Sequence, residues 1–179
     1  VYKRQILIVV TSPVMLITAV VIKLYDKGPV LYKQVRCTKD AKEFYILKFR
    51  SMRVDAEKDG VARLAAKNDS RITPVGKFIR AVRIDELPQL WDVFCGHMSI
   101  IGPRPPLPRE VVLYTPHQMQ RLMVKGGLSC ICQVEGRSDM EFDKWVESDI
   151  EYIKTRSAGL DLKLLFKTIG VVIMKKGAR

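Results

Sequence analysis

The 179-residue sequence is poor in the residue types that build metal centres and disulfide frameworks. It contains two histidines, His97 and His117, and four cysteines. Cys130 and Cys132 stand one residue apart, and no second cluster of cysteine or histidine follows at the spacing of a zinc site. We therefore expect free thiols buried in a protein of a reducing compartment, and neither a zinc finger nor a disulfide scaffold.

Acidic residues are also scarce, with 19 Asp and Glu against 31 Lys and Arg and a net charge of +12. A hydrophobic content of 47% excludes a disordered basic tail and, at this length, favours one folded domain. Such a surface suits an anionic partner: nucleic acid, phosphorylated substrates or acidic lipid. Because aromatic residues are scattered and no helix-turn-helix pattern is present, we expect no nucleic-acid partner.

The longest apolar run extends from Ile6 to Ile22 without a charge. As a straight helix it would reach about 25 Å, less than the roughly 30 Å hydrocarbon core of a bilayer. Pro13 lies in its middle and removes a backbone donor, which kinks a helix. The hydroxyls of Thr11 and Ser12 can bond to the carbonyls that the proline leaves free.

Basic residues flank the apolar run on both sides, with Lys3 and Arg4 before it and Lys23 and Lys27 after it. Since positive flanks prefer the cytoplasmic side, both ends are predicted on the same side. This favours a re-entrant hairpin over residues 1–27, with a buried soluble helix and a truncated span as alternatives. The chain begins at Val1 and not at Met, so we expect its native start to lie upstream.

The remaining chain, residues 28–179, is predicted as one cytosolic, membrane-surface unit of the α+β class, mainly helical. Two strand-like runs, 30–37 and 38–52, flank a polar connection and indicate a small β-hairpin. An exposed helix is predicted over 52–67, and short helices at 74–83 and from Asp85 onward. The later segments are predicted as follows: two short helices broken at Pro116, a loop or strand over 125–137, a helix before residue 156, and an amphipathic helix at the end.

Several charged residues allow more than one interpretation. Lys77, Arg80 and Arg83 recur at helical spacing, as expected of a solvated basic face or of a surface that lies on anionic headgroups. Asp85 and Glu86 stand side by side ahead of Pro88. Acidic residues in a first helical turn are a common helix-start signal, whereas in an enzyme that acts on phosphates they would be catalytic.

Motifs spread over the whole chain decide between these interpretations. In order they are "SP" in the apolar run, "GPVLYKQVR", "LKFRSM", "DSRITPVGKFIR", "DELPQLWDVFCGHMSIIGPRP", "GLSCICQVEGR" and "LDLKLLFKTI". Together they resemble the monotopic phosphoglycosyl transferases, bacterial sugar transferases that begin glycoconjugate assembly. The resemblance implies a membrane protein of the cytoplasmic face of the bacterial inner membrane, with a re-entrant helix–break–helix. It also implies the transfer of a sugar 1-phosphate from a UDP-sugar to polyprenyl phosphate, with Mg²⁺ and release of UMP.

The resemblance also assigns roles to residues. Asp85 would be the nucleophile that carries the phosphosugar, and Glu86, with Asp85, would hold Mg²⁺. Arg104, between prolines, would contact the nucleotide-sugar, because its planar guanidinium pairs with phosphate oxygens. Lys48 and Arg50 would lie on one strand face near the phosphates or form an ion pair with the dyad's helix. Arg137 is a further basic candidate, and Ser12 and Pro13 match the helix-breaking pair.

Some positions depart from the family pattern. Arg83 and Ile84 stand where Ser-Leu is usual, His97 replaces an aspartate, Gly126 a proline and Cys130 a glycine. We expect the last two to loosen one loop and crowd another, without removing the dyad or Arg104. The alternative from another class is a non-catalytic basic module that binds a membrane surface. A homodimer stays open, as do the sugar and the pathway.

Overall fold

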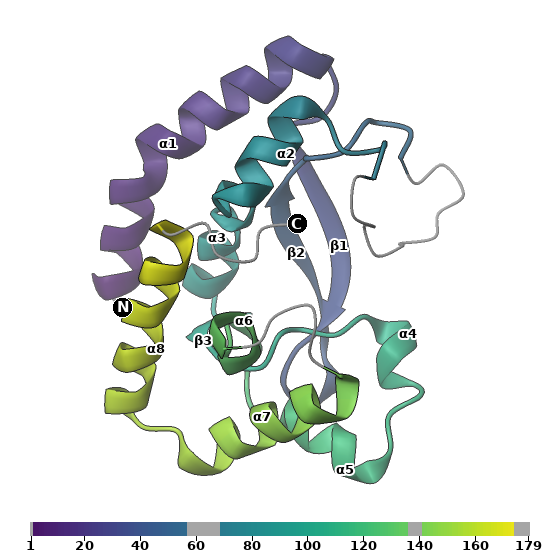
Figure 1. The fold of residues 1–179 in the computed structure, drawn as a ribbon, viewed down its shortest axis with the longest axis vertical. Helices are drawn as coiled ribbons and strands as arrows, with labels where there is room; N and C mark the ends of the chain where they lie inside the picture. Colours follow the sequence, from purple (N-terminus) through teal and green to yellow (C-terminus); the bar gives the residue numbers. More distant parts are fainter. Residues whose placement is uncertain (1, 57–68, 136–140, 174–179) are drawn as a thin grey trace.

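A computed structural model describes residues 2–56, 69–135 and 141–173. Helices surround two small sheets, so the predicted α+β class with mainly helical content is confirmed at this level (Figure 1). The elements are α1 (Tyr2–Asp26), β1 (Leu31–Cys37), η1 (Lys39–Ala41), β2 (Glu43–Phe49), α2 (Pro74–Ala81), η2 (Ile84–Glu86), α3 (Gln89–Phe94), β3 (Ser99–Ile101), α4 (Pro108–Val111), α5 (Pro116–Met119), η3 (Gln120–Met123), β4 (Gly127–Ser129), α6 (Ile131–Glu135), α7 (Phe142–Thr155) and α8 (Ala158–Ile173).

The predicted hairpin is confirmed as the antiparallel pair β1–β2, with Leu31 opposite Phe49 and Cys37 opposite Glu43. Its β-branched and aromatic residues suit a pleated, half-buried surface. Phe44 and Ile46 of β2 pack against Val93 and Met98 in a buried cluster, which fixes α3 on the hairpin. The second sheet pairs β3 in parallel with β4 and brings the loop after β3 beside the chain before β4.

Helix α1 is bent but not interrupted at the Ser12-Pro13 pair. The structure has one continuous helix from Tyr2 to Asp26, and Figure 1 shows that it changes direction along its length. Pro13 cannot donate to the carbonyl of Val9, and the Ser12 hydroxyl donates to that oxygen at 2.7 Å. Thr11 similarly donates to the carbonyl of Leu7 at 2.7 Å. The expected rescue by hydroxyls is confirmed, whereas the expected separation into two helices is not seen.

One side of α1 packs on the rest of the protein and the other is exposed. Ile22 joins Phe49 and Ile79 in a buried cluster that fixes the second half of the helix to β2 and α2. By length and composition, the helical segment Gln5–Asp26 could cross a membrane. Within it, 11% of an apolar stretch of 18 residues is buried in the protein. The re-entrant insertion stays a prediction.

Prolines start three of the short helices, at Pro74, Pro108 and Pro116, where the missing N–H costs nothing. The predicted break at Pro116 and the helix from Pro74 are confirmed. The terminal helix packs through buried Leu164 and keeps Phe166 exposed, so it is amphipathic as expected.

Two assignments are wrong. Residues 125–137 include the short strand β4, but Ile131–Glu135 form helix α6. The helix expected from Met52 does not begin there. Met52 forms an antiparallel bridge with Ile72, and the Arg53 amide donates to the carbonyl of Arg71 at 2.9 Å. Residues 57–67 of that expected helix lie outside the described part.

Helix α2 lies so close to the strand-like segment at Ser51 that Gly76 has no room for a side chain. A Cβ at Gly76 would stand 1.8 Å from the Ser51 carbonyl oxygen. We expect Gly76→Ala to lower the free energy of unfolding by about 1–3 kcal/mol, because backbone must move. Gly159→Ala is the matched control, since a Cβ there meets nothing within 4 Å, and it should stabilise α8 by about 0.5–1 kcal/mol. Denaturant unfolding of both variants tests this, and an unaffected Gly76→Ala would contradict the packing.

Candidate active site

Asp85 and Glu86 lie in their own tight turn, not in the first turn of a helix as the sequence suggested. Arg83 adopts the left-handed conformation (φ 56°) ahead of the 3₁₀ turn η2, and Pro88 is the N-cap of α3. The left-handed region is costly for a residue with a Cβ. The turn that presents the two carboxylates is therefore held by its surroundings, and side chains rather than α3 amides supply their positive partners.

Three cations surround Glu86. Lys48 and Arg104 approach its Oε1 at 3.5 Å each, and Arg83 approaches Oε2 at 3.7 Å. Burial opposes ionisation of Glu86, but Lys48, Arg104 and Arg83 outweigh it and lower its pKa to about 2. Glu86 is therefore a permanent anion that holds the basic groups together.

Asp85 has the opposite electrostatics. Burial and the adjacent Glu86 raise its pKa to about 6, while Lys48, Arg80 and Arg104 act in the opposite direction. Neighbouring carboxylates whose pKa values are pushed apart are typical of catalytic pairs. With this pKa Asp85 is ionised at neutral pH, and nearby cations compensate its charge less completely than that of Glu86.

Asp85 borders a large basic cavity of about 1010 Å³. The basic side chains that line it include Arg36, Lys48, Arg50, Arg80, Arg104 and Arg109. Glu110 is a second carboxylate of the lining, but its Oε2 accepts a hydrogen bond of 2.8 Å from the Leu107 amide at the start of α4. Asp85 is thus a lining carboxylate with a raised pKa, in a cavity that suits an anionic ligand.

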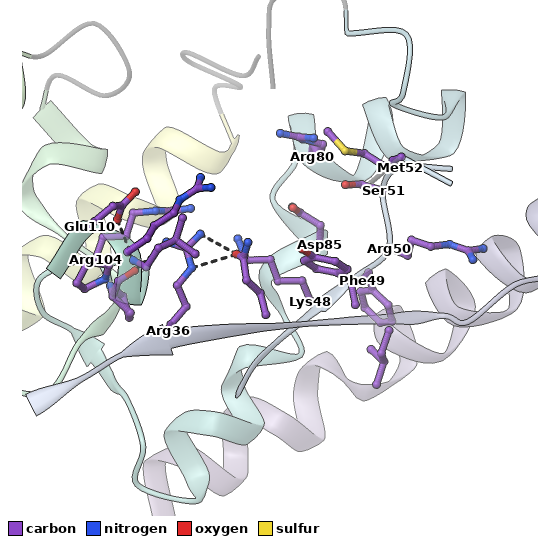
Figure 2. A pocket seen from close by; sticks show the side chains of 18 of the residues that line it. Arg36, Lys48, Phe49, Arg50, Ser51, Met52, Arg80, Asp85, Arg104 and Glu110 are labelled. Atoms are coloured by element: carbon purple, nitrogen blue, oxygen red, sulfur yellow. Dashed lines mark hydrogen bonds between the residues drawn. The ribbon is translucent and has the colours of Figure 1, made fainter. Parts of the chain in front are cut away.

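Lys48 and Arg50 were predicted on one face of a strand near the dyad, but in the structure they have different partners. Lys48 pairs with Glu86, and burial lowers the pKa of this lysine against the influence of Glu86. Arg50 follows the end of β2 and pairs with Asp26 of α1 at 3.2 Å. Figure 2 shows Arg50 directed away from Asp85, so its main contact joins α1 to the hairpin, although it borders the cavity.

Several arginines of the site were not predicted for it, among them Arg36 and Arg80. Arg36 lies near Arg104 (Figure 2) and donates to the Pro105 carbonyl at 3.0 Å, and burial together with Arg104 lowers the pKa of Arg36 to about 10. Arg80 borders the cavity from α2, while Lys77 of the same helix is exposed. Arg80 and Arg83, two of the residues expected on a basic surface, also act on the dyad: Arg80 lowers the pKa of Asp85, and Arg83, which follows α2, approaches Glu86.

A signal for Arg36 was present in the sequence. Tyr32, Gln34 and Arg36 alternate along β1, and Tyr32 pairs with Lys48 across the hairpin. Strand alternation and hairpin register would together have placed Arg36 on the side of Lys48. The position of Arg80 depends on how α2 packs, which no local pattern reveals.

The departures from the family pattern are accommodated locally. The Gly126 amide donates to the Thr38 hydroxyl at 3.2 Å, a bond that a proline could not make, so this loop is held at that point. The Thr38 hydroxyl in turn donates to the carbonyl of His97 at 2.9 Å. Cys130 is buried, as are Cys37 and Cys132, whereas Cys95 is exposed, so burial of the thiols is confirmed for three of the four. Arg137 lies outside the described residues.

Comparison with known proteins fits this site. The sequence profile of the family described as "Bacterial sugar transferase" matches residues 2–175. The chain is 43% identical over 178 residues to "UDP-N-acetylgalactosamine-undecaprenyl-phosphate N-acetylgalactosaminephosphotransferase" of Aeromonas hydrophila, over 94% of the chain and 41% of that protein. It is 38% identical over 182 residues to "UDP-glucose:undecaprenyl-phosphate glucose-1-phosphate transferase" of Klebsiella pneumoniae, over 97% of the chain and 39% of that protein.

A shorter relative, "Uncharacterized sugar transferase EpsL" of Bacillus subtilis, is 39% identical over 93% of the chain and 81% of its own length. The chain spans about two fifths of the longer relatives. The chain belongs to the bacterial sugar transferase family.

Proposed function

We propose that this protein transfers a sugar 1-phosphate from a UDP-sugar to polyprenyl phosphate, with release of UMP. The observation that carries the proposal is the position of Asp85, ionisable and partly desolvated, in a basic cavity. The names of the relatives support a UDP-sugar donor and undecaprenyl phosphate as acceptor, but they differ in the donor sugar. The donor of this chain is therefore left to experiment.

The reaction would proceed in two displacements on phosphorus. An Asp85 oxygen attacks the β-phosphorus of the UDP-sugar, the bond to the bridging oxygen breaks, and UMP leaves with that oxygen. The phosphosugar is then held on Asp85 as an acyl phosphate. A phosphate oxygen of the polyprenyl phosphate attacks the same phosphorus, and Asp85 departs as a carboxylate. A carboxylate nucleophile divides one difficult transfer into two easier ones.

The cations of the cavity would stabilise the charge that moves during both displacements. Lys48 and Arg104 lie at Glu86, next to the nucleophile, and Arg36 and Arg80 border the same cavity. Fixed positive groups directed at developing phosphate charge are a main source of catalysis in phosphoryl transfer. Glu86 acts here through the cations that it holds, as the anion that keeps Lys48 and Arg104 beside Asp85.

The residues also fit Mg²⁺. This ion prefers oxygen ligands and is commonly bound by one or two carboxylates together with substrate phosphates. Asp85 faces the cavity, and Glu86 is ionised with contacts of 3.5–3.7 Å that are longer than tight ion pairs. Asp85 and Glu86 would hold the ion, which would neutralise diphosphate charge.

The membrane would supply the acceptor. Helix α1 has an exposed apolar surface and lies against the hairpin that carries Lys48. We propose that α1 inserts as a re-entrant element and places residues 28–179 on the cytoplasmic face of the bacterial inner membrane. The direct test of the function is UMP release by the protein in nanodiscs with Mg²⁺, undecaprenyl phosphate and single UDP-sugars. Release with one sugar supports it, and silence across a broad panel from folded protein contradicts it.

The proposed nucleophile gives the reaction a defined pH dependence. Asp85 must be ionised to attack, so kcat/KM should fall about tenfold per pH unit below about pH 6 and level off above it. Arg80 lowers the pKa of Asp85, and therefore Arg80→Gln should move this acidic limb to higher pH. Lys77→Gln, on the exposed face of the same helix, is the matched control and should leave the limb in place. A flat profile across this range would contradict an Asp85 nucleophile.

A further inference from the structure

Two thiols and a carboxylate lie close together at one buried point of the protein. Cys130 follows β4, Cys132 lies in α6, and Asp149 lies in α7. Their sulfur and oxygen atoms all lie within 4.8 Å of one another. The three residues are 2%, 5% and 1% exposed. The sequence spacing of the cysteines gave no sign of this cluster, because the third member comes from a different helix.

The separations suit a tetrahedral ion with sulfur ligands. Zinc binds thiolate at about 2.3 Å and carboxylate at about 2.0–2.2 Å, which places two sulfurs about 3.8 Å apart and sulfur and oxygen about 3.5 Å apart. Separations of up to 4.8 Å exceed these values by about 1 Å, a distance that rotations of the side chains would have to close.

Arg121 already orients Asp149, in the way that an outer-shell partner orients a metal ligand. Arg121 Nε and Nη2 both contact its Oδ2, at 2.8 and 2.7 Å. Ligating carboxylates are typically fixed by such hydrogen bonds. The charges also balance: two thiolates, Asp149, Arg121 and a divalent cation sum to zero, the same total as two neutral thiols with the Asp149–Arg121 pair. Binding would therefore add no net charge to a buried region.

We propose that Cys130, Cys132 and Asp149 form a binding site for a thiophilic divalent cation of the zinc class. The site is distinct from the Asp85–Glu86 dyad and supplies three protein ligands to a tetrahedral ion. It would join β4 and α6 to α7 and would lie near Arg104, which is within electrostatic reach of both sulfurs.

The test uses the whole protein in nanodiscs, stripped with EDTA under reductant, and Cd²⁺ as the probe. Thiolate-to-metal absorption should saturate at one equivalent, excess Mg²⁺ should not displace the ion, and Tm should rise. Cys130→Ser should weaken Cd²⁺ binding by more than about 100-fold, because loss of an outer-shell partner alone costs 10- to 100-fold. Cys95→Ser changes the exposed thiol and is the matched control, which should bind as the parent does.

Two outcomes would overturn the proposal. The first is no saturable thiolate absorption in folded parent protein, which needs no variant and so does not depend on how Cys130→Ser folds. The second is absorption that survives Cys130→Ser and is lost in Cys95→Ser, which would place the ion at the exposed thiol. Neither result bears on UMP release, so a failure of the proposed metal site can be distinguished from a failure of the proposed reaction.

Discussion

Replacing Asp85 with asparagine should reduce UMP release by about 10⁴-fold or more. The amide has the shape of the carboxylate but cannot form the acyl phosphate, and the loss of a covalent nucleophile typically has effects of this size or larger. The measurement is UMP release in nanodiscs with Mg²⁺, undecaprenyl phosphate and the preferred UDP-sugar, compared between Asp85→Asn and the parent.

Glu110→Gln provides the matched control for this variant. Among the described residues, Glu110 is the other carboxylate of the cavity lining, and its amide counterpart can still accept the hydrogen bond from the Leu107 amide. We expect Glu110→Gln to keep activity within about tenfold, since only charge away from the reacting phosphorus is lost. Membrane association and Tm of Asp85→Asn should match the parent. Substantial turnover by folded Asp85→Asn would refute the covalent mechanism, and equal losses in both variants would point to general electrostatics.

Replacing Arg121 with methionine should cost about 3–5 kcal/mol in the free energy of unfolding. Arg121 and Asp149 are 2% and 1% exposed and are joined by two contacts of 2.8 and 2.7 Å. Removal of one partner leaves a buried charge without compensation, which is far more costly than loss of a surface pair. Arg121 also lies over the rings of Tyr114 and Trp145, at 5.7 and 5.1 Å from their centroids, so the variant also loses cation–π contacts.

A double variant separates the lost charge from the lost packing. Arg121→Met combined with Asp149→Leu removes both charges, and a buried pair replaced by apolar residues is often tolerated. We expect the double variant to regain at least about half of the loss, as measured by denaturant unfolding with EDTA present. If Arg121→Met lowers the free energy of unfolding by less than about 1 kcal/mol, the Arg121–Asp149 pair is not a buried link between η3 and α7.

Local chemistry made much of the fold predictable. Proline at the first position of a helix fixes where α2 and α5 begin, and the alternating β-formers of 31–37 and 43–49 specify the hairpin. Segment 131–135 was misread because Ile131 and Val134 favour strands, and its helix depends on packing against α7 and α8. Periodicity alone cannot detect that kind of tertiary preference.

The candidate site was predictable only in part, for similar reasons. Asp85, Glu86, Arg104 and Lys48 do lie together, as the resemblance implied. The left-handed residue Arg83 that presents the dyad breaks local preference, and such strain is invisible in a sequence pattern. Arg50 was predicted for the site because alternation along β2 would place it on the same face as Lys48. The strand ends at Phe49, however, and the Arg50 side chain forms an ion pair with Asp26 of α1.

A covalent intermediate can be detected directly, as a phosphosugar attached to Asp85. The protein in nanodiscs is mixed with Mg²⁺ and its UDP-sugar in the absence of polyprenyl phosphate, quenched, digested and examined by mass spectrometry. Our account predicts one equivalent of UMP and a sugar-phosphate adduct on the peptide that contains Asp85, which disappears when undecaprenyl phosphate is added. If UMP forms only when the lipid is present, with full turnover and no adduct at any time, the donor is attacked directly by the lipid and Asp85 is not the nucleophile.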